Sequence, residues 1–316
     1  MRSDDRIDGR TLVLLGAMYA IIVGNAALYY TRPLPLAVHV LLGALGIHLA
    51  FTVWHEAVHE NLSRGRWVNE LVGVLAMLPY MAPYFLGKWI HLEHHRRLNT
   101  EQDPNLVYAG GSLLTLPLRY ARALRYPRRV LTADPRTRGE RFSDRVTIAL
   151  VVAVYGVALA RGMLLDVLVL WLVPFVLAKL TMDWYINWLP HVGLPPDRYR
   201  GTRIIDVAWL TPLVLLHNYH AVHHLWPALP WYRYRATFRA KLSYLQDHGV
   251  PIDHRVAAAW SQRLLGATPL VMAPSEPNQP ESASGKRKSD RVGVAEPYLA
   301  PQGAAPRSTR ESSETP

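Results

Sequence analysis

Long apolar runs alternate with short polar turns over the first two thirds of the 316-residue chain. Residues 11–30 contain no charged side chain, and residues 36–54 form a second apolar run after a short turn with two prolines. Each run is long enough to cross the hydrocarbon core of a bilayer as a helix, which takes about 20 residues. The pattern therefore predicts a helical hairpin that spans a membrane.

A second pair of apolar runs follows in the middle of the chain. Residues 146–160 are short for a span unless Arg145 and Arg161 extend their side chains from its ends toward the membrane surfaces. Residues 163–182 follow at full length. We therefore predict an all-α integral membrane protein with four transmembrane helices in two hairpins.

Two further apolar stretches are not clean spans. Residues 67–86 are interrupted by Pro79 and Pro83, which predicts a pair of short interfacial or re-entrant helices. Residues 204–216 have a similar pattern and are expected to repeat that arrangement. Each stretch leads directly into a group of histidines, so the two form the base of a predicted helical cap.

Histidines cluster at one end of the predicted spans. The pattern HxxxH ends the second apolar run at residues 55–59, and HxxHH occurs at residues 91–95 and again at 220–224. A single histidine follows the fourth run. Because residues three or four apart share one face of a helix, these imidazoles converge at one membrane depth and predict a metal site. The predicted ligands are His55, His59, His91, His94, His95, His191, His220, His223 and His224.

The number of histidines indicates the chemistry. The chain has no cysteine, so nitrogen and oxygen ligands must hold any transition metal, which favours iron, copper or zinc. One ion takes three or four protein ligands, so nine histidines suffice for two. Two irons on neutral imidazoles can bind dioxygen, be reduced and cleave the O–O bond, which leaves an oxidant that attacks an unactivated C–H bond. The protein must then hold a long apolar substrate at the metals and exclude water.

Other polar groups near these histidines have two interpretations each. His48 lies on nearly the same helix face as His55 and either faces the site or, as is commoner for intramembrane polar groups, is hydrogen-bonded within the protein. Five carboxylates either accept imidazole N–H bonds from the ligands or are solvated at the interface. They are Glu56, Glu60, Glu93, Asp103 and Asp183.

Two rival functions were weighed against this interpretation. Residues 55–59 also satisfy the HExxH pattern of zinc metalloproteases, in which two histidines bind zinc and the glutamate activates water. A zinc hydrolase needs one further ligand and has no use for seven more clustered histidines. Haem binding or metal transport would place histidines at mid-membrane, where only His39 and His48 are predicted.

The distribution of arginine predicts the orientation. Residues 96–145 contain eleven arginines against five carboxylates, whereas the two predicted outer turns contain one arginine each. The positive-inside rule therefore places the histidines and both termini in the cytoplasm, with the helices in the cell inner membrane. Basic cytoplasmic loops account for the net charge of +11, so nucleic-acid binding is not indicated.

Composition divides the chain into three parts. Residues 1–10 form a polar leader, and residues 11–266 form the membrane-embedded domain. Residues 267–316 are rich in proline, serine, glycine and charged residues and contain few large apolar ones, which predicts a disordered tail.

The order of the motifs resembles the membrane-bound fatty acid desaturase and hydroxylase superfamily. That order is HxxxH, HxxHH, NxxxH and HxxHH, where NxxxH is formed by Asn187 and His191, and the resemblance covers about residues 30–245. It implies that these histidines bind two irons on the cytosolic side of four transmembrane helices, with Asn187 holding one iron through a water. It also implies dioxygen as the oxidant and electrons from ferredoxin or a similar carrier.

Within that superfamily, residues 218–234 are similar to bacterial and cyanobacterial β-carotene hydroxylases. Glu56 departs from them, because those hydroxylases often have aspartate there and many acyl desaturases have glutamate. The resemblance implies carotenoid ring hydroxylation first, and acyl-lipid desaturation or hydroxylation second. The aromatic run after the last histidines is expected either at the substrate tunnel or in an interfacial belt. It consists of Trp226, Trp231, Tyr232 and Tyr234.

Overall fold

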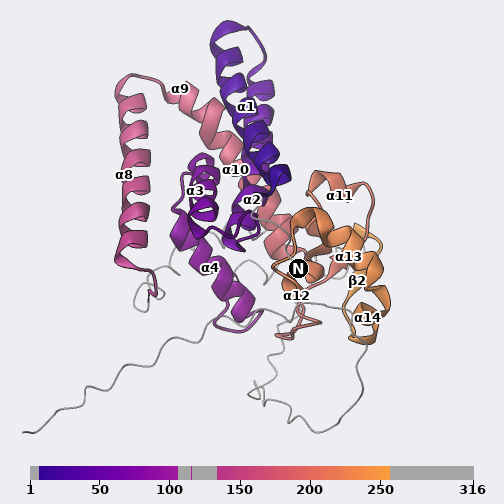
Figure 1. Cartoon of the computed structure of the whole chain (residues 1–316). Coiled ribbons are helices and arrows are strands. Elements are labelled where there is room, and N and C mark those ends of the chain that lie inside the picture. The colour runs from indigo at the N-terminus through magenta and orange to yellow at the C-terminus, as the bar shows by residue number, and fades with distance from the viewer. Residues whose placement is uncertain (1–6, 106–114, 116–133, 257–316) are drawn as a thin grey trace, which may run out of the picture. The chain divides into compact units, whose positions relative to one another are not determined.

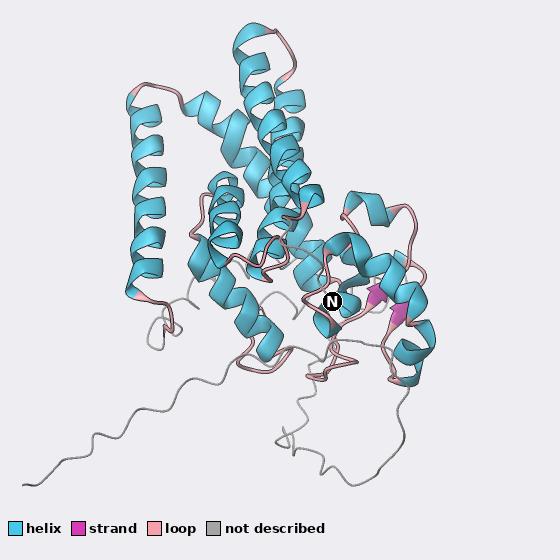
Figure 2. Cartoon of the chain, in the orientation of Figure 1, coloured by secondary structure: helices cyan, strands magenta, loops and turns pink. Residues whose placement is uncertain are grey.

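The computed structural model describes residues 7–105, 115 and 134–256, all within one compact unit. Most of the predicted polar leader and all of the predicted tail, residues 267–316, lie outside the described residues. The three-part division of the chain therefore stays a prediction. Figure 1 shows the order of the elements along the chain, and Figure 2 shows that the described part is almost entirely helical.

The first hairpin consists of α1 (Gly9–Thr31) and α2 (Leu36–Val58), which pack against each other (Figure 1). Asp8 caps α1 by accepting a hydrogen bond from the backbone N–H of Arg10. Inside the hairpin, the His39 ring and the Asn25 amide pair at 2.9 Å, which satisfies two polar groups in an apolar setting. Because α2 continues past the predicted end of the apolar run, His55 lies in its last turn and not after it.

The broken pair predicted over residues 67–86 is confirmed. It comprises α3 (Arg66–Met77), the 3-10 turn η1 (Leu78–Tyr80) and α4 (Tyr84–Arg96), and the chain bends by 100° between its two helices. Pro79 lies in η1, and Met81 has φ of +53°, which ends the first helix and redirects the chain. A side chain at Gly73 would overlap the ring of Tyr84, so glycine lets α4 begin directly against α3.

The second hairpin begins with α8 (Arg138–Ala160), which has 23 residues and starts before the predicted apolar run. Thr137 and Glu140 form a reciprocal capping box at its first turn. This cap sets the start of the helix, so the predicted fifteen-residue span with arginines extending from both ends was too short. The apolar pattern does not reveal the start of α8, because the first turns of this helix are polar.

The fourth span, Leu164–Trp188, changes its helical pitch along its length. It runs through α9 (Leu164–Val167), the π-helical η4 (Leu168–Leu172), α10 (Val173–Met182) and the π-helical η5 (Asp183–Trp188). The described residues thus contain four helices long and apolar enough to span a membrane, as predicted. The fourth packs on α2, where a Cβ at Gly43 would lie only 2.9 Å from the Pro174 ring.

The cap corrects one prediction, because residues 204–216 do not form an interfacial helix pair. The two-residue strand β1 (Ile204–Ile205) pairs in parallel with β2 (Ile252–Asp253), and the single-turn helix α11 (Leu210–Leu213) follows. Leu215 and Leu216 then adopt positive φ values of 45° and 64°, which ends helical continuation. The β-branched Ile204 and Ile205 are fully buried in this pairing, a tertiary contact that their local apolar pattern does not reveal.

The remaining elements of the cap are short helical turns. They are η6 (His217–Tyr219), α12 (His220–Leu225), η7 (Trp231–Arg233), α13 (Tyr234–Ala240) and α14 (Leu242–Asp247). Buried Tyr219, Tyr234, Phe238 and Leu245 hold them together in one apolar cluster. This cluster positions α12 against the histidines of α2 and α4.

Candidate metal centre

All nine predicted histidines come together in two groups, and within each group one ring nitrogen of every member lies within 4.8 Å of the others. The groups draw on α2, α4 and α12, on His59 directly after α2, and on His191 in the turn after η5. Cluster 1 contains His55, His59, His91, His95 and His223. Cluster 2 contains His94, His191, His220 and His224.

The two HxxHH motifs divide between the clusters in opposite ways. In α4, the i, i+4 pair His91 and His95 belongs to cluster 1, and His94 belongs to cluster 2. In α12, the i, i+4 pair His220 and His224 belongs to cluster 2, and His223 belongs to cluster 1. Each helix therefore gives a pair to one cluster and a single histidine to the other, so neither cluster can form without both helices.

The ring nitrogens have the spacing of ligands around an ion. Nε2 atoms contact one another at 3.0 Å between His55 and His223, 2.8 Å between His59 and His91, 3.1 Å between His91 and His95, and 2.9 Å between His95 and His223. In cluster 2, the Nε2 of His220 is 2.9 Å from that of His191 and 3.0 Å from that of His224. Two imidazole nitrogens bound to one ion at about 2.1 Å and at right angles are about 3.0 Å apart. Both clusters therefore fit a metal ion.

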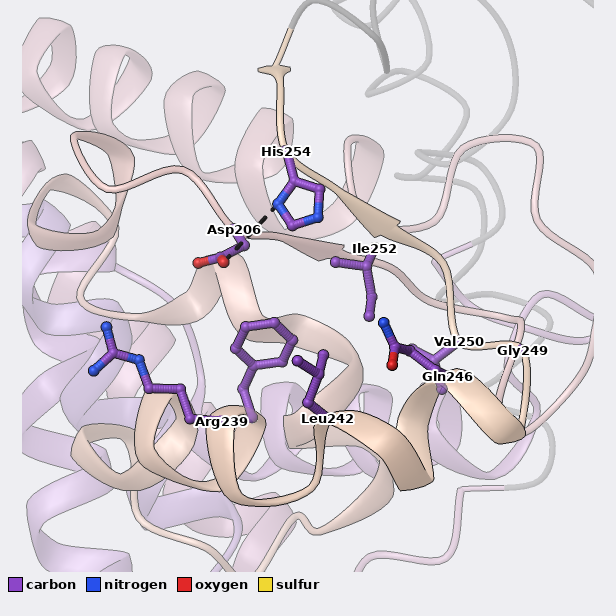
Figure 3. Close-up of a pocket in the computed structure, with 9 residues that line it drawn as sticks. Asp206, Arg239, Leu242, Gln246, Gly249, Val250, Ile252 and His254 are labelled. Carbon is purple, nitrogen blue, oxygen red and sulfur yellow. Dashed lines mark ion pairs between the residues drawn. The ribbon is translucent and has the colours of Figure 1, made fainter.

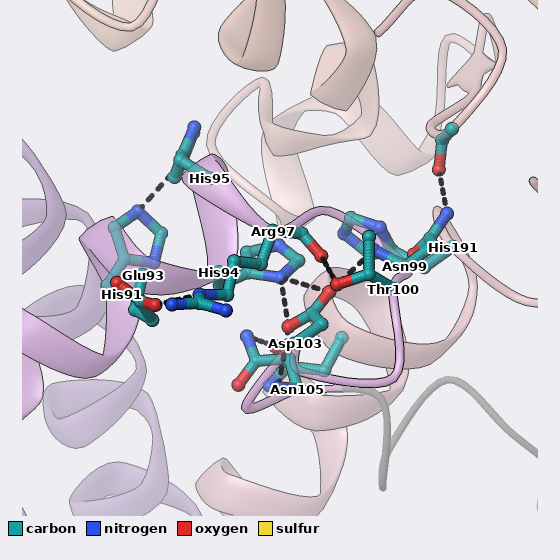
Figure 4. Close-up of polar contacts among 12 residues, drawn as sticks. His91, Glu93, His94, His95, Arg97, Asn99, Thr100, Asp103, Asn105 and His191 are labelled. Atoms are coloured by element: carbon teal, nitrogen blue, oxygen red, sulfur yellow. Dashed lines mark hydrogen bonds and ion pairs between the residues drawn. The ribbon is translucent and has the colours of Figure 1, made fainter. Parts of the chain in front are cut away.

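Asp103 orients one of these histidines, as Figure 4 shows. Its carboxylate accepts a hydrogen bond from Nδ1 of His94, at 2.9 and 3.0 Å from its two oxygens. The backbone N–H groups of Asn99 and Asn105 also donate to it, each at 2.7 Å, so the turn after α4 folds around this side chain. Holding the proton on Nδ1 leaves the Nε2 lone pair of His94 for a metal.

The other acidic candidates have different partners. Glu60 binds Lys88 at 3.0 Å, and Glu93 binds the arginines that follow the histidines of α4. Asp183 accepts a hydrogen bond from the Asn187 amide at 2.6 Å and pairs with Lys179. Asp103 is thus the acidic candidate with a short hydrogen bond to a ligand candidate, whereas Glu56 approaches Nδ1 of His55 only to 3.6 Å.

Asn187 is held in a polar chain beside cluster 2. Besides donating to Asp183, it accepts a hydrogen bond from the Asn105 amide at 3.1 Å. It lines the same cavity as His94 and His220. The structure thus brings the tenth predicted site residue next to the histidines, and its contact with an ion stays a prediction.

An apolar cavity of about 200 Å³ opens against both clusters. His91 of cluster 1 and His94 and His220 of cluster 2 lie in its wall. Its apolar lining comes from α2, the broken pair and the end of the fourth span: Phe51, Trp54, Met77, Tyr80, Ile90, Met182 and Ile186. Asn105, Asn187 and the paired Lys179 and Asp183 complete its lining. A largely apolar wall with a few polar groups is typical of a ligand site.

The aromatic run does not line this cavity, so the first of its two expected places, the wall of the substrate tunnel, is not found here. Trp231 instead donates from its indole to Thr11 at 3.2 Å, and Arg10 lies over the ring of Tyr232 at 4.5 Å. Tyr234 is fully buried against His223. The run joins the cap to the start of α1, an arrangement that depends on tertiary packing and not on local pattern.

His217 is a buried histidine at the site that sequence reasoning did not select. Its Nε2 lies 3.1 Å from the Thr52 hydroxyl, and its ring centroid is 5.0 Å from that of His55. Burial lowers its pKa from 6.5 to about 3, so it is neutral. The sequence feature that could have pointed to His217 is its position three residues before His220. His48, by contrast, is hydrogen-bonded within the protein, as expected, because its Nε2 lies 2.9 Å from the carbonyl oxygen of Leu213 in the cap.

A second hollow lies in the cap, between β2 and the helices α13 and α14 (Figure 3). Its described lining includes Asp206, Phe238, Arg239, Gln246 and His254, and none of the nine histidines belongs to it. It is therefore separate from the metal centre.

Comparison with known proteins agrees with this geometry. The model of the fatty acid desaturase family matches residues 31–256, which is most of the chain and includes all the histidines. The chain belongs to the fatty acid desaturase family. It is therefore a membrane-bound oxidoreductase, and its two clusters fit the diiron site typical of this family. The zinc protease and haem alternatives are not supported.

Individual relatives refine the resemblance. Two β-carotene ketolases of Paracoccus are 32% identical: the one from strain PC1 over 71% of this chain and 92% of its own length, and the one from strain N81106 / MBIC 01143 over 59% and 72%. An sn-1 acyl-lipid omega-3 desaturase (ferredoxin) of Nostoc sp. (strain 36) is 24% identical over 71% of this chain and 58% of its own length. The carotenoid enzymes among these relatives are thus ketolases, whereas the sequence pattern had suggested hydroxylases.

Proposed function

We propose that this protein uses dioxygen to oxidise a C–H bond on the end ring of a carotenoid. The observation that carries the proposal is the apolar cavity against both histidine clusters, together with the similarity to two β-carotene ketolases. A cavity of about 200 Å³ is smaller than the 300–1,000 Å³ typical of sites that enclose a drug-sized ligand. It therefore suits one end of a long molecule whose remainder stays in the membrane.

The histidines would hold two irons, which when bound supply the reductive activation of dioxygen. The all-nitrogen donor set and the ligand-like spacing of the Nε2 atoms support iron on neutral imidazole. Asp103 keeps the proton of His94 on Nδ1, which leaves its Nε2 available. The net reaction takes one C–H bond, dioxygen, two electrons and two protons to an alcohol and water.

The cavity wall orients the substrate and excludes water. The Trp54 ring lies edge-on to His91, with centroids 5.4 Å apart, so an apolar ring in the cavity is confined beside cluster 1. Confinement selects which ring carbon faces the metals. A second oxidation of the same carbon gives a geminal diol that loses water to a ketone, so one site accounts for either a hydroxylated or a keto product.

Acyl-lipid oxidation is the second candidate function. The relatives include the Nostoc omega-3 desaturase and an sn-1 oleoyl-lipid 12-desaturase of Synechocystis that is 25% identical over 71% of this chain. Glu56 also matches the glutamate of many acyl desaturases. A straight acyl chain fits an apolar cavity as well as a ring does, so the product decides between the two.

The electron donor and the orientation complete the proposal. We infer that a ferredoxin or similar carrier supplies the electrons, in line with the printed name of the Nostoc relative. The arginine asymmetry supports a cytoplasmic position for the clusters at the inner membrane, where such a carrier would be available.

Expression in a β-carotene-producing bacterium tests the proposal, with pigments and total fatty acids analysed from the same cells. We expect new hydroxylated or keto carotenoids with the native chain and none with His223→Ala. Conversion of β-carotene without change in acyl chains supports the carotenoid function. Unchanged β-carotene alongside new unsaturated or hydroxylated acyl chains would reject it in favour of the lipid function.

A further inference from the structure

We propose that Tyr234 is a positioning residue, whose buried hydroxyl contacts Nδ1 of His223 and thereby fixes this histidine in cluster 1, with Glu56 holding the segment that leads to Tyr234. The inference rests on the metal centre of the proposed function but not on its substrate. It assigns roles to two residues whose sequence context pointed elsewhere: Glu56 to the HExxH pattern and Tyr234 to the aromatic run.

The position of the tyrosine hydroxyl is the first observation. Tyr234 is the first residue of α13, is fully buried, and places its hydroxyl 3.0 Å from Nδ1 of His223. The other nitrogen of that ring, Nε2, lies 3.0 Å from His55 and 2.9 Å from His95. Tyr234 therefore contacts His223 on the side opposite to the cluster.

Glu56 holds the segment that carries this tyrosine. Its side chain is fully buried in the last turn of α2. It accepts the backbone N–H of Trp231 at 3.3 Å. Glu56 thus faces the cap and holds the segment that precedes α13.

The direction of this hydrogen bond follows from the donors and acceptors available. A His223 that binds a metal through Nε2 carries its proton on Nδ1 and donates it to the tyrosine oxygen. This contact fixes the tautomer and the ring angle of His223, as carboxylate partners do for many metal-bound histidines.

The two clusters then differ in how a histidine is fixed. In cluster 2, Asp103 accepts directly from Nδ1 of His94 at 2.9 Å. In cluster 1, the phenol of Tyr234 takes the corresponding position at Nδ1 of His223, at 3.0 Å. Two ions held in this way have different surroundings, which spectroscopy can resolve.

The test separates the hydroxyl from the ring that carries it. Tyr234→Phe keeps the buried ring and removes only the hydroxyl. Tyr219→Phe is the matched control, because Tyr219 is equally buried in the same apolar cluster and its hydroxyl binds a carboxylate, Asp206, at 2.9 Å. Full-length proteins are purified, reconstituted anaerobically with ⁵⁷Fe and compared by iron content, Mössbauer spectrum and loss of iron to a chelator.

We expect Tyr234→Phe to change one of two iron signals and to weaken iron binding by about 10- to 100-fold, the usual effect of removing such a partner. Asp103→Asn should change the other signal, and Tyr219→Phe neither. Glu56→Gln, which can still accept the backbone N–H of Trp231, should retain more iron than Glu56→Ala.

A Tyr234→Phe protein with the native spectrum and native iron loss would overturn the inference, as would equal changes in Tyr219→Phe. A native protein that holds one zinc and no iron would overturn the metal centre and this inference together. Altered iron signals in cells that make no oxidised carotenoid would leave Tyr234 in its role and reject only the substrate.

Discussion

The imidazole rings of His95 and His224 stack nearly parallel, with centroids 4.1 Å apart and planes at 17°. One ring belongs to cluster 1 and the other to cluster 2. The two clusters therefore adjoin at this pair, and ions bound in them would be neighbours. Such proximity is what a joint reduction of dioxygen by two metals requires.

We expect the purified protein to hold about two irons per chain. Elemental analysis after anaerobic iron reconstitution measures this directly.

Replacement of His94, His95, His223 or His224 by alanine should abolish turnover while the protein stays in the membrane, because each change removes a nitrogen from a cluster. His248→Ala and His254→Ala serve as controls, since both side chains are exposed and belong to neither cluster. Full turnover in His223→Ala would contradict the assignment of α12.

Product distribution should depend on Trp54 and not on Trp231. Trp54 lines the cavity beside His91, so Trp54→Ala lets the substrate shift and should alter the products and lower turnover by up to about 100-fold. Trp231 bonds to Thr11 and Glu56, away from the cavity, so Trp231→Ala should lower thermal stability with little change in product ratio. Pigment chromatography and thermal unfolding measure the two effects. The opposite pattern would restore the aromatic run to the substrate tunnel.

The metal-free protein should lose stability in mild acid. Burial lowers the pKa of four cap histidines, to about 3 for His217 and well below 6.5 for His191, His220 and His223. Below about pH 6.5 the unfolded chain binds more protons than the folded one, so stability rises with pH in this range and falls as pH is lowered. Each such group contributes a slope of about 1.4 kcal/mol per pH unit to the free energy of unfolding.

Tryptophan fluorescence during heating, repeated at several pH values, measures this pH dependence, and His217→Gln should reduce it. A flat profile would contradict neutral burial.

The predicted orientation can be tested because the chain has no cysteine. A single cysteine introduced at exposed Ser243, in the cap, should react with a membrane-impermeant maleimide only after the cells are opened. A single cysteine at exposed Leu34, in the turn between α1 and α2, should react in intact cells. Labelling in the reverse order would invert the topology and place the histidines outside.

Local pattern predicted the spans and all nine clustered histidines. Membrane thickness sets the length of an apolar run, and helix geometry sets the spacing of residues that share a face, so both can be read from the sequence. Local pattern did not predict how the histidines divide between clusters. That division depends on how α4 and α12 are rotated against each other, which is a tertiary property. The start of α8 was missed because a polar capping box, not an apolar run, begins the helix.

The residues that fix the ligands were the hardest to predict. Asp103 was one of five acidic candidates, and only the turn around it distinguishes it from Glu93, whose side chain binds arginines. Tyr234 belongs to the aromatic run, for which the sequence left a substrate tunnel and an interfacial belt as alternatives, and neither includes a contact with a histidine. Its contact with His223 depends on the turn at η7, which folds α13 back onto α12.

The opposite division of the two HxxHH motifs makes each ion a cross-link. An ion in cluster 1 ties α2 and α4 to α12, and an ion in cluster 2 ties α4 to α12 again, across more than a hundred residues of intervening chain. Closing so long a loop costs the unfolded chain entropy, which is the same reason that a disulfide stabilises a secreted protein. In a chain without cysteine, the ions would take the place of that covalent link. Iron starvation would then deplete the cell of the folded protein itself, and not only of its activity.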